Sequence, residues 1–522
     1  SDRFVTLPAT NVGRGKWIIA ATVMIGNIMA VLDSSIVNVS LDDMAGNMGA
    51  TIEEITWVVT GYILANVLVM PIIGMLSARF GRKRLYMTAI AVFTVASMLC
   101  GLSHSLNTMV GFRIVQGLAG GVLVTVPQAI LRESFPPNEQ GLAMGVYGMG
   151  IVLAPAIGPT LGGWITDQYT WPWIFFINVP VGILNLLMVQ RLIEDPVYLK
   201  RTKAAIDFTG LAFMIAGLGA FQLMLEEGER NDWFSSTFIV RLAVVSAVGM
   251  LLFIWRELTT QRPAVDIRLL ANVRFTAATF LGGVMGMGLN GVLFILPLFL
   301  QNLLGYDAMQ AGFMLMPRSI AMLVMMPVAG RMYNRFGPRL LVAVGLGFLV
   351  FGFWDLGKLT TEVGYWDLAW PQIWQGVGFS FLFAALSTAA LAPVPKPEIT
   401  AATGLYNVVR QVMGSIGIAL AATLLTHSES TYHAVLVERA SGPVAQRWIA
   451  TTMAGLQRLG ATAAEARERA LGLLDSLVSR QATVLAYNHI FQLVAIMFAV
   501  VAPLLFLIPR SGHAEGASEL VE

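Results

Sequence analysis

Charged residues and cysteine are both scarce in this chain. Asp, Glu, Lys and Arg make up 12% of its 522 residues, against about 25% in soluble globular proteins. The single cysteine, Cys100, lies inside an apolar run, so a disulfide framework is excluded, and no Cys/His spacing suits a metal site. Phosphate-cradling loops and nucleophile–base sets are also missing. We therefore expect no enzyme activity, no metal, no cofactor and no nucleic-acid partner.

Apolar residues are abundant instead. They form 56% of the chain, whose mean hydropathy is +0.70. A helix needs roughly 20 apolar residues to cross a bilayer, and alternating patterns typical of a transmembrane barrel are missing. The first run is too long for a signal segment and is expected to be retained. The sequence thus predicts an all-α polytopic membrane protein with fourteen spans, at about 17–39, 57–77, 85–103, 108–131, 142–165, 172–192, 207–226, 236–256, 275–300, 312–330, 339–357, 370–392, 403–426 and 486–508.

The distribution of Lys and Arg between the loops predicts the topology, because basic residues collect in short cytoplasmic loops. With the N-terminus inside, the short outer loops contain only Arg230 and Lys358 among several acids. Both termini are therefore expected in the cytoplasm. The inner loops then contain Arg79, Arg82, Lys83, Arg84, Arg132, Arg191, Lys200, Arg201, Lys203, Arg256, Arg262, Arg268, Arg331, Arg335, Arg339 and Lys396.

An internal repeat divides the chain into two similar units. The segment PIIGMLSARFGRKRL at 71–85 returns as PVAGRMYNRFGPRLL at 327–341, and RIVQGLAGG at 113–121 has a weaker echo in IWQGVGFSF at 373–381. Spans 1–6 and 9–14 are thus two copies of a six-helix unit, an arrangement typical of transporters. We expect an N-terminal bundle at 1–200, two inserted helices with a linker at 201–272, and a C-terminal bundle at 273–522.

Five motifs in order resemble the major facilitator superfamily, specifically its fourteen-helix drug:proton antiporters of the EmrB/QacA type. They are LDSSIVNVSL (32–41), GMLSARFGRK (74–83), RIVQG (113–117), GVYGMGIVLAPAIGPTLGG (145–163) and WPWIFFINVPVG (171–182). The resemblance covers nearly the whole chain and implies the major facilitator fold. Three positions depart from the family pattern. Ala78 replaces an acid of the loop motif, Ala154 replaces a glycine, and Asp42 replaces a proline.

Asp33 and Arg113 are the candidates for proton coupling. A charge at the centre of a membrane helix costs about 2.5–3.5 kcal/mol and is usually functional, although a carboxyl fixed by a helix–helix hydrogen bond is the structural alternative. The matching residues of span 9 are Leu289 and Asn290, so the acid occurs in one copy alone. Arg113 cannot lose its proton, and its alternative is snorkelling to the interface. A nearby Arg113 would stabilise the ionised carboxylate and release it on moving away.

Other candidates fall into two groups. Polar residues within the spans are expected at the substrate cavity: Asn38, Gln116, Asn290 and Asp355. Glycines, a proline and bases of the loop and fifth-span motifs are expected to hold helices close and to gate: Gly74, Arg79, Gly81, Arg82, Lys83, Gly158, Pro159, Gly162 and Gly163.

The region 428–485 is a long, charged outer segment. Thr462 and Glu465 form a capping-box pattern, after which Leu471, Leu474 and Val478 recur at helical spacing, so a helical hairpin is expected. For EmrB-like exporters of double-membraned bacteria, the resemblance implies an EmrA-like periplasmic adaptor and an outer-membrane channel as partners. A passive lid over the cavity mouth is the alternative.

The function expected from these observations is proton-coupled export of hydrophobic, often toxic drugs from the bacterial inner membrane by alternating access. The proton gradient would drive it, without a cofactor, and the bilayer would surround it. Two alternatives stay open. One is an exporter of a native metabolite or siderophore, and the other is a receptor-like relative that transports nothing.

Overall fold

The computed structural model describes residues 9–195, 206–260, 263–440 and 442–508. Helices account for nearly all of this part of the chain, which contains no β-strand, and fourteen helical stretches in it are long and apolar enough to cross a membrane, as predicted. The inner-loop residues Lys200, Arg201, Lys203 and Arg262 of the predicted topology, and the boundary drawn at 200/201, lie outside the described residues.

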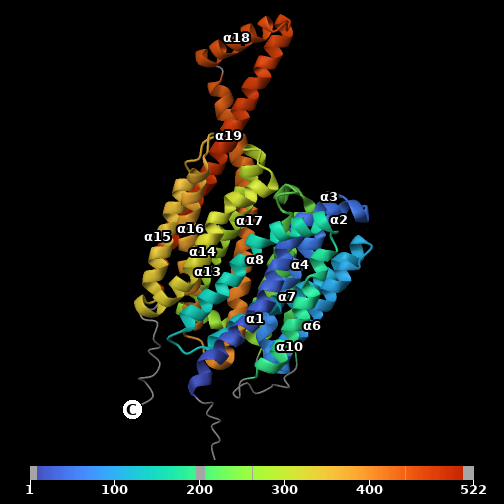
Figure 1. The fold of residues 1–522 in the computed structure, drawn as a ribbon, viewed down its shortest axis with the longest axis vertical. Helices are drawn as coiled ribbons and strands as arrows, with labels where there is room; N and C mark the ends of the chain where they lie inside the picture. Colours follow the sequence, from blue (N-terminus) through green and yellow to red (C-terminus); the bar gives the residue numbers. More distant parts are fainter. Residues whose placement is uncertain (1–8, 196–205, 261–262, 441, 509–522) are drawn as a thin grey trace, which may run out of the picture.

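The first bundle occupies the blue-to-teal part of the ribbon in Figure 1. Its long helices are α1 (Ala9–Ile36), α4 (Trp57–Val69) with its continuation α5 (Ile73–Phe80), α6 (Arg82–Gly101), α7 (Leu106–Ser134), α8 (Gln140–Gln168) and α10 (Asn178–Leu192). Short helical segments join them: η1 (Val37–Ser40), α2 (Leu41–Met48), α3 (Ile52–Ile55), η2 (Met70–Ile72) and α9 (Trp173–Phe176).

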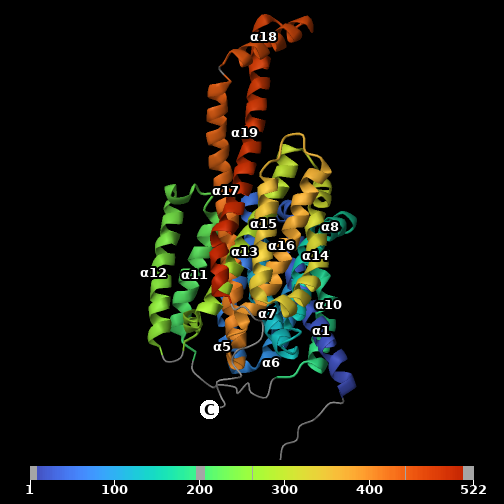
Figure 2. The same cartoon turned by 90° about the vertical axis from the view of Figure 1, so that its left-hand side faces the viewer.

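The second bundle lies beside the first in Figure 1, and two further helices lie to one side of them in Figure 2, with α12 outermost. The separate pair is α11 (Phe208–Glu227) and α12 (Thr237–Thr259), with η3 (Trp233–Ser235) between them and η4 (Ile267–Ala271) in the linker that follows. The second bundle consists of α13 (Val273–Leu298), η5 (Phe299–Leu303), α14 (Ala308–Phe336), α15 (Pro338–Leu356), α16 (Tyr365–Leu391), η6 (Lys396–Glu398), α17 (Ile399–Arg439), α18 (Pro443–Arg458), α19 (Ala463–Val501) and η7 (Ala502–Leu507).

The predicted outer hairpin is helical, and its last helix, α19, begins with the capping box of Thr462 and Glu465. Its boundaries differ from the prediction, because α17 and α19 pass from the bundle into the hairpin without a break (Figure 2). The reason is local: no glycine or proline interrupts 418–441 or 473–502, and these are the residues that end helices most often. We call the end of the molecule with the hairpin the hairpin side, and the end where α1 begins the terminal side.

Close contacts between the two bundles lie towards the terminal side. A methyl group added at Gly74 would lie 2.5 Å from Ala401 Cβ, and one added at Gly141 would lie 2.6 Å from Gly330 O. Asn407 Nδ2 donates to Gln128 Oε1 across the same interface at 2.9 Å. Small residues let helices approach in membranes where larger ones would hold them apart. The bundles are therefore in direct contact at this side.

Candidate functional site

The tightest polar cluster of the first bundle is centred on Asp33 of α1. Arg113 Nη1, from the beginning of α7, lies 2.5 Å from Asp33 Oδ2, and both side chains are fully buried. Asp33 Oδ1 accepts from Gln116 Nε2 at 2.9 Å and from Asn178 Nδ2 at 2.9 Å. The four side chains form a hydrogen-bonded network in which both carboxylate oxygens of Asp33 are satisfied and only Arg113 Nη2 has no partner among the described residues. Such hydrogen bonds offset part of the desolvation of a buried ion pair.

Neighbouring backbone and aromatic groups hold the arginine in place. Arg113 Nε donates to Val58 O of α4 at 3.1 Å, and its guanidinium lies 4.3 Å from the ring centroid of Tyr62. Gly117 makes this close contact between α7 and α4 possible, since a methyl group at Gly117 would lie 2.3 Å from Tyr62 O. The glycine allows α7 to approach α4, and the buried cation faces the ring of Tyr62.

The α1–α8 seam lies next to the acid. Methyl groups at Gly158 and Gly162 would lie 2.5 Å from Ser35 Oγ and 2.8 Å from Ile36 Cγ1, respectively. Pro159 is inside α8 and exposed, whereas a methyl group at Gly163 would meet only Val39, at 3.9 Å. Gly158 and Gly162 therefore fix α8 against the segment of α1 that contains Asp33.

The basic loop motif is tied to other helices of its own bundle. Gly81, with φ +89°, begins α6 and has its counterpart in Gly337, with φ +78°, at the start of α15, so the repeated motif takes the same left-handed turn twice. Arg82 is almost fully buried and pairs with both carboxylate oxygens of Glu133 at the end of α7. Lys83 N donates to Asp195 Oδ1 at 2.7 Å. The motif thus joins three helix ends.

The remaining loop-motif residues play different structural parts. Gly74 lies at the interface between the bundles, and the Arg79 guanidinium lies 5.9 Å from the ring centroid of Phe80. The structure therefore places only part of the motif between the bundles.

The four residues expected at a substrate cavity lie in different places. Gln116 belongs to the Asp33 cluster, and Asn38 is exposed on η1. Asn290 lies in the α13–α17 seam, where a methyl group at Gly414 would be 2.6 Å from its Nδ2. Asp355 is partly exposed near Lys358 at the hairpin-side end of α15, with 3.9 Å between Oδ1 and Nζ. Their common role stays a prediction.

Asn178 is the member of the cluster that sequence reasoning missed. It lies within the motif WPWIFFINVPVG and begins α10. Its amide also donates to Ser97 Oγ of α6 at 3.1 Å, so Asn178 of α10 links Asp33 of α1 to α6. An asparagine inside an otherwise apolar span was the available signal, because a buried amide needs partners.

The inserted helices contact both bundles near the hairpin side. Trp233 Nε1 donates to Thr423 Oγ1 of α17 at 2.8 Å, and Arg230 Nη1 donates to Thr56 Oγ1 of the first bundle at 3.3 Å. Glu229 accepts from Thr423 and Thr426 at 2.7 and 2.9 Å. Burial raises the pKa of Glu229, but the hydrogen bonds from Thr423, Thr426 and Trp233 outweigh it, so the pKa lies below its ordinary value. The turn between α11 and α12 therefore bridges the two units.

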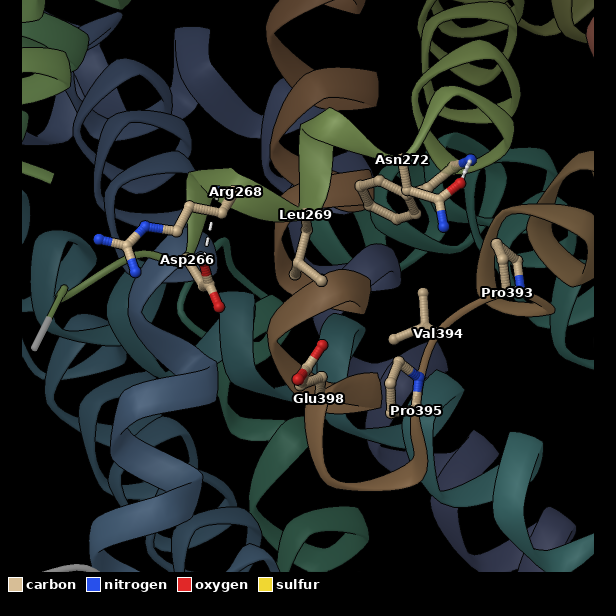
Figure 3. A pocket seen from close by; sticks show the side chains of 9 residues that line it. Asp266, Arg268, Leu269, Asn272, Pro393, Val394, Pro395 and Glu398 are labelled. Carbon is tan, nitrogen blue, oxygen red and sulfur yellow. Dashed lines mark hydrogen bonds between the residues drawn. The ribbon is translucent and has the colours of Figure 1, made fainter. Parts of the chain in front are cut away.

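A separate cavity of about 400 Å³ lies on the terminal side, between the linker before α13 and the loop before α17 (Figure 3). Asp266, Arg268 and Glu398 are its charged residues, and Arg268 N donates to Asp266 Oδ1 at 3.2 Å. None of the predicted site residues lines it. Its lining residues are Asp266, Arg268, Leu269, Asn272, Phe275, Pro393, Val394, Pro395 and Glu398.

Comparison with known proteins identifies the family of this chain. The family model of the Major Facilitator Superfamily matches residues 23–418. The chain is 35% identical over 496 residues to the fatty acid resistance protein FarB of Neisseria gonorrhoeae, covering 94% of this chain and 95% of FarB. It is 34% identical over 503 residues to the multidrug export protein EmrB of Escherichia coli, covering 96% of each.

A solved structure of the proton:xylose symporter XylE is similar in fold. It superimposes with a TM-score of 0.60 at 12% sequence identity, covering 96% of this chain and 97% of XylE. At this identity the likeness concerns the fold alone.

Proposed function

The chain belongs to the major facilitator superfamily, and from that membership we propose that it is a proton-coupled multidrug efflux transporter working by alternating access. The buried Asp33–Arg113 pair is the observation that supports proton coupling most directly. Protonation of Asp33 would remove the charge that holds Arg113, Gln116 and Asn178 in their present arrangement. A change of packing around α1, α7 and α10 follows from that loss.

The glycine seams connect such a change to the two bundles. Asp33 lies next to the Gly158 contact of α8, and α8 also meets the second bundle at Gly141. A shift of α1 would therefore move a helix that forms part of the interface. Interfaces packed this closely change between discrete arrangements rather than deforming gradually.

Membrane orientation follows from charge. The bases of both loop motifs lie on the terminal side, where the two bundles are in contact, and basic residues favour the cytoplasm. We propose a protein of the bacterial inner membrane with both termini in the cytoplasm. In this orientation the close contacts between the bundles lie towards the cytoplasmic side.

The hairpin is the proposed docking site for a periplasmic adaptor of a tripartite export system, the arrangement that the EmrB resemblance implies. It rises away from the bundles in Figures 1 and 2, which favours docking over a lid. Val444 and Leu459 at its tip are 78% and 86% exposed, so both apolar side chains are accessible to a partner. Leu471, Leu473 and Leu477 on α19 are each about half exposed.

Transport in proteoliposomes tests the proposal. Purified protein is reconstituted, a pH gradient is imposed, and a panel of hydrophobic cationic, neutral and anionic dyes is followed. Dye movement that requires the gradient and stops when a protonophore dissipates it is the expected result. Movement that ignores the gradient would contradict proton coupling, and no movement of any dye would favour a metabolite exporter or a receptor-like protein.

A further inference from the structure

The second bundle contains a counterpart of the Asp33 cluster, and two matching contacts define it. In the first bundle Arg113 Nε donates to Val58 O; in the second, Gln372 Nε2 donates to Met314 O at 2.7 Å. Gln372 of α16 is 259 positions after Arg113 of α7, and Met314 of α14 is 256 positions after Val58 of α4. Gln372 therefore occupies the place of Arg113.

A second pair of contacts places Arg318. A methyl group at Gly117 would lie 2.3 Å from Tyr62 O, and one at Gly376, 259 positions later, would lie 2.6 Å from Arg318 O. Arg318 is therefore the counterpart of Tyr62, the residue whose ring faces the Arg113 guanidinium. In the first bundle the buried arginine of this cluster is on α7, whereas in the second it is on α14, the counterpart of α4.

No acid accompanies this charge. Arg318 is 2% exposed, and its Nη1 has no hydrogen-bond partner among the described residues. The side chains of Gln372 and Gln375 are fully buried on the helix packed against it. Gln372 Oε1 and both polar atoms of Gln375 are likewise without partners in the described chain. In the first bundle both polar atoms of Gln116 have partners, and Arg113 is bonded through Nε and Nη1 and paired with Asp33, with only its Nη2 unpartnered among the described residues.

The position that matches Asp33 is Leu289, 256 residues later. The α13–α17 seam fixes this match to within one residue: Gly414, 256 positions after Gly158, meets Asn290, which is 255 positions after Ser35, at 2.6 and 2.5 Å for the added methyl groups. Neither Leu289 nor its neighbours Gly288 and Asn290 carry an acid. The second bundle thus has a buried cation and amide donors but lacks the carboxylate that neutralises them in the first. An isolated charge inside a bundle is costly, so a counter-charge is needed.

We propose that Arg318, Gln372 and Gln375 form an anion-binding centre in the second bundle. Its ligand is a monovalent anion, taken either as a free inorganic ion or as the carboxylate head of an amphipathic molecule. The guanidinium and the Gln375 amide supply N–H donors, and the anion replaces the acid that Asp33 provides in the first bundle. Guanidinium groups match carboxylates and small oxyanions especially well.

Thermal unfolding of the purified full-length protein tests the proposal. Melting temperatures are recorded while sodium chloride or sodium decanoate replaces sodium HEPES at constant sodium concentration, with decanol as the uncharged control for the chain. Because a ligand that binds only the folded state stabilises it, we expect Tm to rise by about 2–5 °C at saturation. A rise with chloride identifies a free ion, and a rise with decanoate but not with chloride or decanol identifies a carboxylate head group.

Variants separate this centre from general salt effects. Arg318→Met should abolish the anion-dependent rise, whereas Arg241→Met, which removes an exposed arginine of α12, should retain it. Leu289→Asp keeps Arg318 and supplies an internal carboxylate, so its Tm should be high without added anion and insensitive to it. Leu289→Asp keeps the test decisive if Arg318→Met does not fold. An equal rise in wild type, Arg318→Met and Leu289→Asp, or no rise in wild type, would overturn the proposal and leave the glutamine carbonyls as partners of Arg318.

Discussion

Arg113 Nη1 lies 2.5 Å from Asp33 Oδ2, and neither side chain has any exposed surface. The pair joins α7 to α1, and Gln116 and Asn178 occupy the other carboxylate oxygen. The acid is therefore within the first bundle rather than at its surface. Proton coupling through Asp33 requires this network to open.

Replacing Asp33 with Asn keeps size and polarity but removes the titrating group. We expect a folded, inserted protein whose gradient-driven export in proteoliposomes is lost. Asp43→Asn, at an exposed position of α2, is the matched control and should transport normally. Active efflux at the wild-type rate by Asp33→Asn would remove Asp33 from the coupling mechanism.

Replacing Arg113 with Gln leaves the Asp33 carboxylate buried without its cation. Breaking one side of a buried ion pair costs about 3–5 kcal/mol, so we expect a marked fall in Tm. The double variant Asp33→Asn/Arg113→Gln should recover most of this stability because no charge remains, but not transport. Thermal unfolding of the wild type, the two single variants and the double variant measures the interaction energy between Asp33 and Arg113. A double variant no more stable than Arg113→Gln would show that the arginine acts through packing.

Neutralising Arg79, Arg82, Lys83 and Arg84 together should lower the amount of inserted protein or slow turnover, with drug binding little changed. The structural reason is that Arg82 and Lys83 tie helix ends of one bundle. Membrane yield, turnover and dye affinity are measured separately. Glu133→Gln isolates the Arg82 contact and should reproduce part of the loss. Selective weakening of drug binding would contradict this reading.

Deleting 432–482 with a short Gly/Ser bridge should preserve transport in proteoliposomes but abolish resistance in cells and co-purification with an adaptor. The cut lies just beyond the contact of Thr483 Oγ1 with Glu429 Oε1, at 2.5 Å, which leaves the two helices paired at their base. Replacing Val444 and Leu459 with Ser is the milder variant. Retained resistance and adaptor binding would exclude docking, and failure in proteoliposomes would favour a lid.

The hydrogen bonds to Glu229 predict a pH-dependent contribution to stability. Because its pKa in the folded protein is lowered, the ionised group stabilises the fold above about pH 4.5, and the contribution is lost as pH falls through the lowered value. Glu229→Gln should therefore have a lower Tm at neutral pH, with the difference shrinking in acid. Unfolding curves between pH 7 and 3.5 measure it. A difference independent of pH would show that ionisation is not involved.

Apolar run length, the repeated loop motif and the capping box are local in the sequence, and they predicted the fourteen spans and the helical hairpin. They could not predict that α17 and α19 continue into the hairpin, since helix ends depend on weak local signals. The sequence also identified Asp33, Arg113 and Gln116 one at a time. Asn178 was missed because its role depends on a helix 145 positions away from Asp33.

The sequence by itself determined the membrane class, the two-unit repeat and the candidate charges, because hydropathy and spacing are written along the chain. Only the tertiary structure decided which polar groups meet. Whether a buried charge has a partner depends on how α1, α7 and α10, or α13, α14 and α16, pack across the bundle. That packing gives Arg113 an acid and leaves Arg318 without one among the described residues. The interaction between two buried charges depends on the few ångströms that separate them, and the residue pattern along one helix does not determine that distance.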